Sequence, residues 1–502
     1  MCKVRTGAYV ANNNIHGLSH SDAARRLYGI ALGHVETIDG KNTTLEANNV
    51  IVINNTIHDM IVPAGIIQPG YGIFVEGRNM KILNNHVENI QGYTGIYSKG
   101  YGIVHKENTL INAGRLYAIC IKNFDATDDD VLIENNTITG ILDDTNSIYA
   151  GYYGLGINME AGRFKILNNW FSMTSNYTGH YESAAVWLNY PIVKGIVEGN
   201  TIYSERASAI CVNNGVTGTL TIEGNDITQR MQSASVTGGN LLYWKTIAST
   251  AVINCKDNTI NLDRGKHLSY SLSSDPGSTL NMTGNTIDIR TSVVSAMLLS
   301  NITLNLLHNT VNLNANLEST ARAGGILSGG TPAAPYRVED NIINCKTMDT
   351  AYLFTMPLLF TMLRNQINFD PGCALLSVVD YRPSDNAGSY DITTAADNIL
   401  GDIQAALGGS AANADYFIRF YLSGGYAFPE IVIRDNVAVV KQRLINRSVS
   451  GGGIPSVGAI TATYNSVYSE QYNDNDAVII DTALREPNLV LANNTSLRGG
   501  GN

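Results

Sequence analysis

The chain has 502 residues, a formal net charge of −10 and a sequence pI of about 5.4. Because it is acidic and contains no block of basic residues, we expect no nucleic-acid partner. No apolar run approaches the ~18 residues of a membrane-spanning segment, and the N-terminal sequence MCKVRTGAYV has no apolar stretch typical of a secretion signal. The sequence therefore favours a protein that does not insert into a membrane.

A short motif recurs along almost the whole chain: a β-branched run, then an Asn, then a usually apolar residue two positions later. Seventeen copies follow one another at intervals of 23 to 42 residues, about 30 on average. A period of this size indicates a solenoid. The repeated residues are Asn13, Asn55, Asn85, Asn108, Asn136, Asn169, Asn200, Asn225, Asn258, Asn285, Asn309, Asn341, Asn365, Asn398, Asn436, Asn465 and Asn494.

Each repeat reads as two short strands with the Asn at the corner between them. Apolar residues alternate with polar ones on both sides of the corner, which is the two-residue period of a strand. Asn tolerates the left-handed conformation that a tight corner needs, and stacked Asn amides can hydrogen-bond from one coil to the next. No helical pattern recurs between the corners. The sequence therefore predicts an all-β parallel β-helix of about seventeen coils, with three strands per coil.

The predicted coils change character towards the C-terminus. We expect residues 1–375 to form the main β-helix and to carry a binding groove. Beyond about residue 375 the coils lengthen and become glycine-rich, as in GGSAANADYF, YLSGGYAFP and SVSGGGIPSVG. We expect residues 376–502 to continue the β-helix as elongated coils and to provide contacts between subunits.

One strand of each coil can be aligned by its first inward apolar residue, starting with Ile73-Phe74-Val75-Glu76. The first and third residues then face the core, and the second and fourth face outward. The second residues form an aromatic column, and the fourth residues form a charged column. The aromatic column is Phe74, Tyr97, Cys120, Asn158, Trp187, Cys211 and Tyr243; the charged column is Glu76, Lys99, Lys122, Glu160, Asn189, Asn213 and Lys245.

Aromatic side chains beside charges and amides suit a sugar chain, which has flat apolar faces and many hydroxyl groups. The two columns therefore predict a carbohydrate-binding groove. Its expected binding residues are Phe74, Glu76, Tyr97, Lys99, Lys122, Asn158, Trp187, Asn189, Tyr243 and Lys245. The alternative is that the aromatic side chains support overlying loops or a neighbouring subunit.

Glycosidic cleavage needs two carboxyl groups, ~5 Å apart for retention or ~6.5–9.5 Å apart for inversion. Glu76 and Glu160 lie three coils apart, roughly 14 Å at ~4.8 Å per coil, so they cannot form this pair. Lys122, one coil from Glu160, suits Glu160 to the role of base or nucleophile. The alternative is that Glu160 only forms a salt bridge with Lys122.

Two long loops flank Glu160, at 141–154 and 172–183, and they carry Asp144 and Glu182. Loops inserted on a rigid scaffold commonly carry function. We therefore expect the catalytic pair to be Glu160 with either Glu182 or Asp144.

No cofactor and no metal site is expected. The six cysteines are scattered without disulfide or metal-ligand spacing, which indicates reduced thiols. The histidines, among them His105 and His308, are also dispersed, and we expect them at the surface or beside corners. The acidic run at 128–130 directly precedes a predicted strand, which favours a solvated turn over a calcium site.

The coil with its Asn corners resembles the right-handed β-helix superfamily of pectate lyases, polygalacturonases and phage tailspike depolymerases, over roughly residues 10–495. The chain lacks the RxPxxR and WIDH elements of pectate lyases, the NTD and RIK elements of polygalacturonases, the GxxDFIFG element of pectin methylesterases and the DPHE element of alginate epimerases. Tailspikes share the coil without a common catalytic signature. Among these branches, the chain is therefore most similar to the tailspikes.

This resemblance implies a homotrimeric depolymerase on a phage virion, which cleaves a bacterial surface polysaccharide (capsule, exopolysaccharide or O-antigen) by hydrolysis with paired carboxylates. Two alternatives stay open. One is a polysaccharide lyase that acts on a uronate-containing glycan by β-elimination, with Lys122 or a loop Tyr as base. The other is a glycan-binding adhesin without catalytic activity.

Overall fold

The structure is a computed structural model. It describes residues 7–19, 26–38, 41–45, 47–61, 70–123, 131–140, 155–173, 184–205, 208–230, 240–244, 247–248, 250–263, 267–271, 277–290, 297–299, 302–314, 325–329, 336–346, 349–356, 360–371, 373–381, 393–408, 410–423, 428–450, 457–481 and 489–498. The chain forms two compact units: unit 1 comprises residues 1–254 and 258–266, and unit 2 comprises residues 255–257 and 267–502. The expected change of character near residue 375 stays a prediction.

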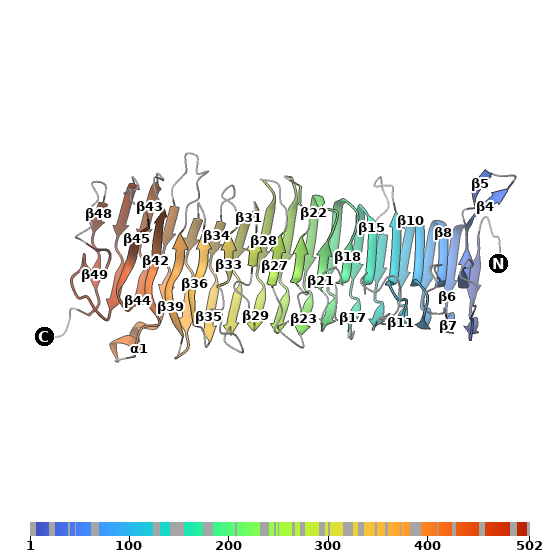
Figure 1. Cartoon of the computed structure of the whole chain (residues 1–502), viewed down its shortest axis with the longest axis horizontal. Coiled ribbons are helices and arrows are strands. Elements are labelled where there is room, and N and C mark those ends of the chain that lie inside the picture. The colour runs from blue at the N-terminus through green and yellow to red at the C-terminus, as the bar shows by residue number, and fades with distance from the viewer. Residues whose placement is uncertain are drawn as a thin grey trace. The chain divides into compact units, whose positions relative to one another are not determined.

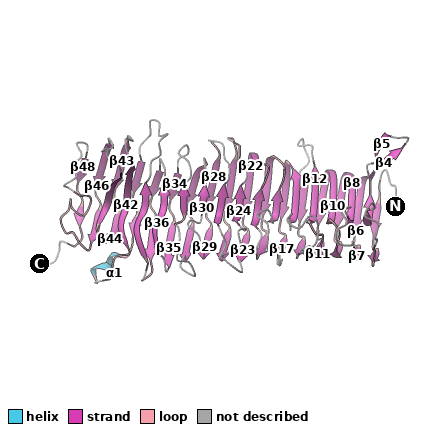
Figure 2. Cartoon of the chain, in the orientation of Figure 1, coloured by secondary structure: helices cyan, strands magenta, loops and turns pink. Residues whose placement is uncertain are grey.

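The described part of unit 1 consists of strands (Figures 1 and 2). They are β1 (Tyr9–Ala11), β2 (Asn14–His16), β3 (Leu27–Leu32), β4 (His34–Ile38), β5 (Lys41–Leu45), β6 (Ala47–Ile53), β7 (Thr56–Met60), β8 (Gly70–Leu83), β9 (His86–Ile90), β10 (Thr94–Lys106), β11 (Thr109–Ala113), β12 (Tyr117–Asn123), β13 (Val131–Glu134), β14 (Thr137–Thr139), β15 (Leu155–Ala161), β16 (Arg163–Leu167), β17 (Trp170–Met173), β18 (Ala184–Leu188), β19 (Ile192–Glu198), β20 (Thr201–Ser204), β21 (Ser208–Val212), β22 (Val216–Glu223), β23 (Asp226–Arg230), β24 (Asn240–Trp244), β25 (Val252–Lys256) and β26 (Thr259–Asp263).

The described part of unit 2 contains one short helix, α1 (Ile403–Leu407), and a similar set of strands. These are β27 (His267–Ser271), β28 (Thr279–Thr283), β29 (Thr286–Arg290), β30 (Met297–Leu299), β31 (Thr303–Leu307), β32 (Thr310–Asn314), β33 (Leu327–Gly329), β34 (Tyr336–Glu339), β35 (Ile342–Lys346), β36 (Asp349–Met356), β37 (Phe360–Leu363), β38 (Gln366–Phe369), β39 (Ala374–Tyr381), β40 (Thr393–Ala396), β41 (Ile399–Leu400), β42 (Ala414–Ser423), β43 (Phe428–Arg434), β44 (Val437–Val440), β45 (Arg443–Ser450), β46 (Val457–Thr463), β47 (Ser466–Ser469), β48 (Leu489–Ala492) and β49 (Thr495–Ser496).

Three strands make one coil, as predicted. In unit 1, β12, β13 and β14 pair in parallel with β15, β16 and β17, their counterparts in the next coil. In unit 2, β36, β37 and β38 pair in the same way with β39, β40 and β41. The prediction of an all-β, right-handed parallel β-helix is confirmed.

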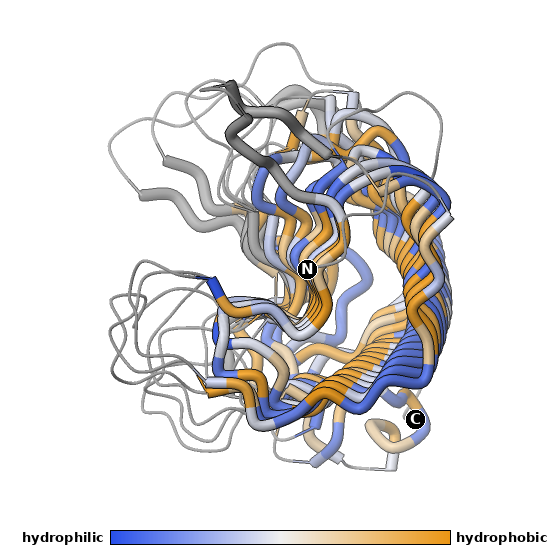
Figure 3. Tube along the Cα trace, turned by 90° about the vertical axis from the view of Figure 1, so that its right-hand side faces the viewer, coloured by the Kyte–Doolittle hydropathy of each residue, from blue (hydrophilic) through white to orange (hydrophobic). Residues whose placement is uncertain are grey.

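The alternation of side chains along the strands places the core inside the coils. In β13, Val131 and Ile133 are fully buried, whereas the residues between and after them are partly exposed. Orange and blue segments alternate in the same way along the described strands in Figure 3. Burial of these aliphatic side chains contributes the main favourable term in folding, at about 25 cal/mol per Å² of apolar surface removed from water.

The repeated Asn residues form a hydrogen-bonded ladder within each unit, from Asn13 to Asn258 in unit 1 and from Asn285 to Asn494 in unit 2. Asn136 is typical and is 1% exposed. Its Oδ1 accepts from both the backbone N and the Nδ2 of Asn108, each at 2.9 Å. Its Nδ2 donates to Asn169 Oδ1 at 2.9 Å and to the backbone oxygens of His105 and Glu134. The ladder therefore satisfies buried backbone groups as well as its own amides.

The expectation that the ladder Asn itself takes the left-handed conformation is wrong. The residue before it does so, as at Asn135 with φ 55°, His308 with φ 55° and Arg364 with φ 53°. The physical reason is that two adjacent residues have different roles at the corner. The first turns the chain with a positive φ, and the second points its side chain inward and hydrogen-bonds to the neighbouring coils. Asn, Asp and Gly occupy most of the turning positions because they adopt positive φ at low cost.

We predict that Asn136→Ala lowers the free energy of unfolding by roughly 3 kcal/mol or more, because several buried groups lose their partner at about 1–3 kcal/mol each. Asn135→Gly is the matched control: Asn135 is exposed, and Gly takes its positive φ freely, so a change within about 1 kcal/mol is expected. Denaturant titration of both variants measures the difference. Equal destabilisation by the two substitutions would contradict the ladder's role.

His105 is an exception among the histidines, and the expectation of a surface or corner position is wrong for it. Its side chain is fully buried, with Nε2 at 2.8 Å from Ser98 Oγ, and its Nδ1 has no hydrogen-bond partner among the described residues. Burial lowers the pKa of His105 from 6.5 to about 3, because the charged imidazolium is poorly solvated in the core. The folded chain therefore keeps this side chain neutral.

The burial of His105 predicts a pH dependence of stability. Below pH 6.5 the unfolded chain binds a proton at His105 that the folded chain does not bind until about pH 3. The free energy of unfolding should therefore fall through this window, by up to about 1.4 kcal/mol per pH unit from this residue. Denaturant titrations at pH 7, 6, 5 and 4 should show a smaller fall for His105→Gln than for the wild type. The exposed His16→Gln should follow the wild type.

Candidate functional site

The outer face of unit 1 carries the residues predicted for the groove. The strands β8, β10, β12, β15, β18, β21 and β24 pair in the predicted register, so that Phe74 lies beside Tyr97, and Glu76 beside Lys99. The same register continues through the later strands of the face. Lys245 lies outside the described residues.

The alternation of side chains is interrupted at the start of these strands, which brings further side chains to the outer face. A Cβ atom at Gly72 would meet Gly95 O at 2.6 Å and Val87 Cγ1 at 2.9 Å, so this position faces the core and admits no side chain without rearrangement. Tyr71, the residue before Gly72, then faces outward. Its ring lies 5.2 Å from that of Phe74 and 5.3 Å from that of Tyr97.

These rings belong to an aromatic cluster, which consists of Tyr28, Tyr71, Phe74, Tyr93, Tyr97 and Tyr117. Phe74 and Tyr97 stack with centroids 5.1 Å apart and ring planes 1° apart. The sequence did not predict Tyr28, Tyr71, Tyr93 and Tyr117, because the alternation was aligned only from Ile73 onward. The small residues Gly72, Gly95 and Ala118, at one position of successive strands, are the signal that could have revealed the interruption of the alternation.

The aromatic column is more buried than expected. Phe74, Trp187 and Tyr243 are 6%, 2% and 8% exposed, and Asn158 is 1% exposed. The prediction of aromatic rings lying open to solvent is therefore wrong for these residues. Their flat faces are already covered in the folded chain, which agrees with the alternative that they support neighbouring segments. Tyr97 alone among the aromatic side chains of this column is partly exposed.

The charged column contains two ion pairs. Lys99 Nζ lies 2.6 Å from Glu76 Oε1, and Lys122 Nζ lies 3.3 Å from Glu160 Oε2. The four residues occupy successive coils in the order Glu76, Lys99, Lys122, Glu160. The salt bridge between Glu160 and Lys122 is thus present. At ~4.8 Å per coil, the two carboxylates are separated by roughly 14 Å.

Glu160 is the better-placed carboxylate for chemistry. Its Oε1 accepts a hydrogen bond from Asn158 Nδ2 at 3.1 Å, while Oε2 faces Lys122. The side chain of Glu160 is 14% exposed, so solvent or a ligand can reach it. Asn158 Nδ2 also contacts Cys120 Sγ at 3.4 Å, and Asn158 Oδ1 is buried without a hydrogen-bond partner among the described residues.

The surroundings of Glu160 raise the pKa values of neighbouring acids. Burial, followed by the charge of nearby groups that include Glu160, raises the pKa of Tyr97 and of Tyr117 well above 10. Burial also raises the pKa of the Cys120 thiol to about 12. These three groups therefore stay protonated near neutral pH, and the cysteine is no nucleophile in this state.

An amide cluster extends the charged column beyond Glu160. Asn213 Nδ2 donates to Asn189 Oδ1 at 2.7 Å, and Asn214 Nδ2 donates to Asn189 O and Oδ1 at 2.9 and 3.1 Å. Asn189 lies one coil from Glu160, since Leu188 pairs with Met159. The face therefore continues as neutral hydrogen-bonding groups. The predicted catalytic partners Asp144 and Glu182 lie outside the described residues, and so does the acidic run at 128–130.

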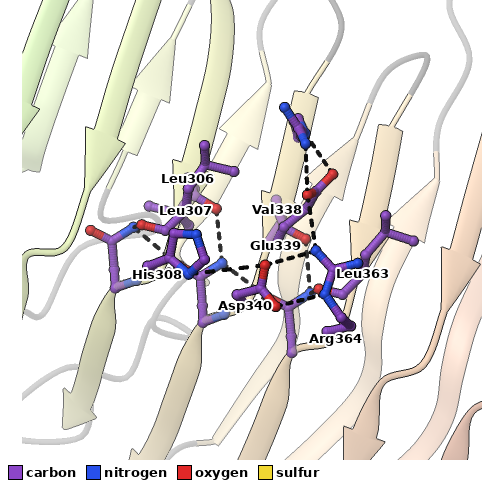
Figure 4. A network of polar contacts seen from close by, with 12 residues as sticks. Leu306, Leu307, His308, Val338, Glu339, Asp340, Leu363 and Arg364 are labelled. Atoms are coloured by element: carbon purple, nitrogen blue, oxygen red, sulfur yellow. Dashed lines mark hydrogen bonds and ion pairs between the residues drawn. The ribbon is translucent and has the colours of Figure 1, made fainter.

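Unit 2 carries a separate charged network at the Asn corners (Figure 4). Glu339, 5% exposed at its side chain, pairs with Arg337 and Arg364, and Asp340 accepts two hydrogen bonds of 2.7 Å from Arg364. His308 Nδ1 lies 3.9 Å from Asp340. Hydrogen bonds from Arg364 lower the pKa of Asp340. Asp340 and Arg364 occupy turning positions, so their ion pair joins the turning residues of two successive corners beside the intact Asn ladder.

The described part of the chain holds free cysteines and no group of metal ligands. Cys120, Cys211, Cys255, Cys345 and Cys373 are free and buried. No group of three or more His, Cys, Asp or Glu among the described residues could hold a metal ion. Within the same ranges, no helix is long and apolar enough to cross a membrane.

Comparisons with protein-family models, with characterised proteins and with solved structures gave no match.

Proposed function

We propose that the chain binds a bacterial surface polysaccharide on the outer face of unit 1 and cleaves its glycosidic bonds by hydrolysis. The parallel β-helix is compatible with an enzyme that acts on polysaccharides, because each coil adds one row of side chains to a long face that an extended glycan can follow. In this proposal the protein is a tailspike-like depolymerase of a phage virion, and it works as a homotrimer.

The observation that carries the proposal is the setting of Glu160. Its carboxylate is held from two sides, by Asn158 and Lys122, and it stays accessible on a face whose neighbouring side chains are mostly buried. Tyr97, partly exposed and next to this row, offers a ring on which a sugar can stack. A carboxylate fixed in this way is suited to act as base or nucleophile at the anomeric carbon.

Hydrolysis needs a second carboxyl group. Glu76 is too far away along the column, at roughly 14 Å against the ~5 to ~9.5 Å that glycosidases use. We therefore keep Asp144 or Glu182 as the proposed general acid. If Glu160 acts together with either residue, the role of Lys122 is to neutralise the negative charge of Glu160 before the reaction begins.

Products distinguish this function from its two competitors. We predict that incubation with surface polysaccharides from a panel of bacterial hosts yields shorter chains with new reducing ends and no new ultraviolet absorbance. Size-exclusion chromatography, a reducing-end assay and absorbance near 235 nm measure these changes. Absorbance would identify a lyase acting on uronate. Tight binding without any change of chain length would identify an adhesin, and both results would contradict hydrolysis.

We predict that Glu160→Gln lowers kcat on the susceptible polysaccharide by at least about 10²-fold, because positioned acid–base groups contribute about 10²–10⁴-fold. Its KM should change little, since the amide keeps the shape and most contacts of the side chain. Glu198→Gln is the matched control, because Glu198 is exposed at the far end of β19. Unchanged kcat for Glu160→Gln, with normal circular dichroism, would remove Glu160 from the catalytic role.

A further inference from the structure

The order of charges in the charged column is unusual for a row of ion pairs. Glu76, Lys99, Lys122 and Glu160 follow one another on adjacent strands, so the two lysines are direct neighbours in register. Strict alternation of acid and base would place an attractive contact at each step. Here the middle step sets two positive charges opposite each other, which destabilises a sheet. Stability alone therefore does not explain this order.

Among the described residues, each lysine is paired only on its far side. Lys99 Nζ contacts Glu76, and Lys122 Nζ contacts Glu160, at 2.6 and 3.3 Å. The side chains of Lys99 and Lys122 are 37% and 32% exposed, so both ammonium groups can be reached from solvent. An ammonium group has three N–H donors. Donors of both lysines are thus left for a ligand that sits on the step between them.

We propose that Lys99 and Lys122 together bind the anionic group of an acidic sugar, so that the substrate of this face is a charged polysaccharide. An anion between the two ammonium groups would relieve their repulsion and gain two charge-assisted hydrogen bonds. The partly exposed Tyr97, which precedes Lys99 by two residues on the same face of β10, lies beside the place where the sugar ring would stack. This inference names the substrate class of the proposed function and rests on it.

The site also has a specificity consequence. Glu76 and Glu160 stand at either end of the lysine pair, at about one coil from the nearer lysine. An acidic group displaced by one coil in either direction would face a carboxylate instead of a cation. The column therefore favours one register of the glycan, with its anionic group at the lysines and the adjacent sugar at Glu160.

Lysine-specific nuclear magnetic resonance tests the site without knowledge of the natural glycan. The chain is produced with ¹³C,¹⁵N-labelled lysine, which leaves the three N–H donors of each ammonium group intact, and the Lys99 and Lys122 side-chain signals are assigned from Lys99→Gln and Lys122→Gln. Sodium glucuronate, glucose 6-sulfate, glucose and sodium chloride are then titrated separately. Lys194, exposed on β19, serves as the internal control.

We expect the signals of Lys99 and Lys122 to shift together with glucuronate or with the sulfate, and to stay in place with glucose or sodium chloride at equal ionic strength. The response to each acidic sugar tells a carboxylate-bearing from a sulfate-bearing substrate. Equal shifts of Lys194, equal shifts with glucose, or no shift at all would overturn the inference. Cleavage of a neutral host polysaccharide without these shifts would overturn it while leaving the proposed hydrolase intact.

Discussion

The buried amide of the corner is the interaction on which the coils depend. A parallel sheet leaves no short connection between its strands, so each coil must turn sharply and still satisfy the backbone groups that the turn buries. The ladder Asn does this with one side chain. Asn136 Oδ1 accepts two hydrogen bonds from the preceding coil, and Asn136 Nδ2 donates three to its surroundings. A leucine or valine side chain at this position could fill the space but could not form hydrogen bonds.

The ladder also fixes the register of the residues on the opposite strands of each coil. Because each coil repeats the same corner, residues at one strand position stack in register from coil to coil, as the pairing of Tyr97 with Cys120 and of Lys122 with Glu160 shows. A single sequence position per coil thereby becomes a column on the surface. This register alone forms the charged column, so its order of charges can be read directly from the sequence.

Most of the fold and of the register could be predicted from the sequence, because both follow from periodicity. The departures arise where a side chain's environment is set by three-dimensional packing. The burial of Trp187 and the core position of His105 cannot be read from alternation, which gives the direction of a side chain but not what covers it. The outward position of Tyr71 does not follow from alternation, because the two-residue period is interrupted at the core-facing Gly72. The proposed partners of Glu160, Asp144 and Glu182, come from segments between the repeated strands, and the repeat does not encode the conformation of such segments.

We propose that a glycan lies across β10, β12 and β15 with its scissile bond at Glu160. A crystal structure of the Glu160→Gln protein with an oligosaccharide from a susceptible host polysaccharide tests it most directly. We expect a sugar ring within hydrogen-bonding distance of residue 160, and an acidic group of the glycan at Lys99 and Lys122. An oligosaccharide bound only to unit 2, or to a face of unit 1 away from these strands, would contradict it.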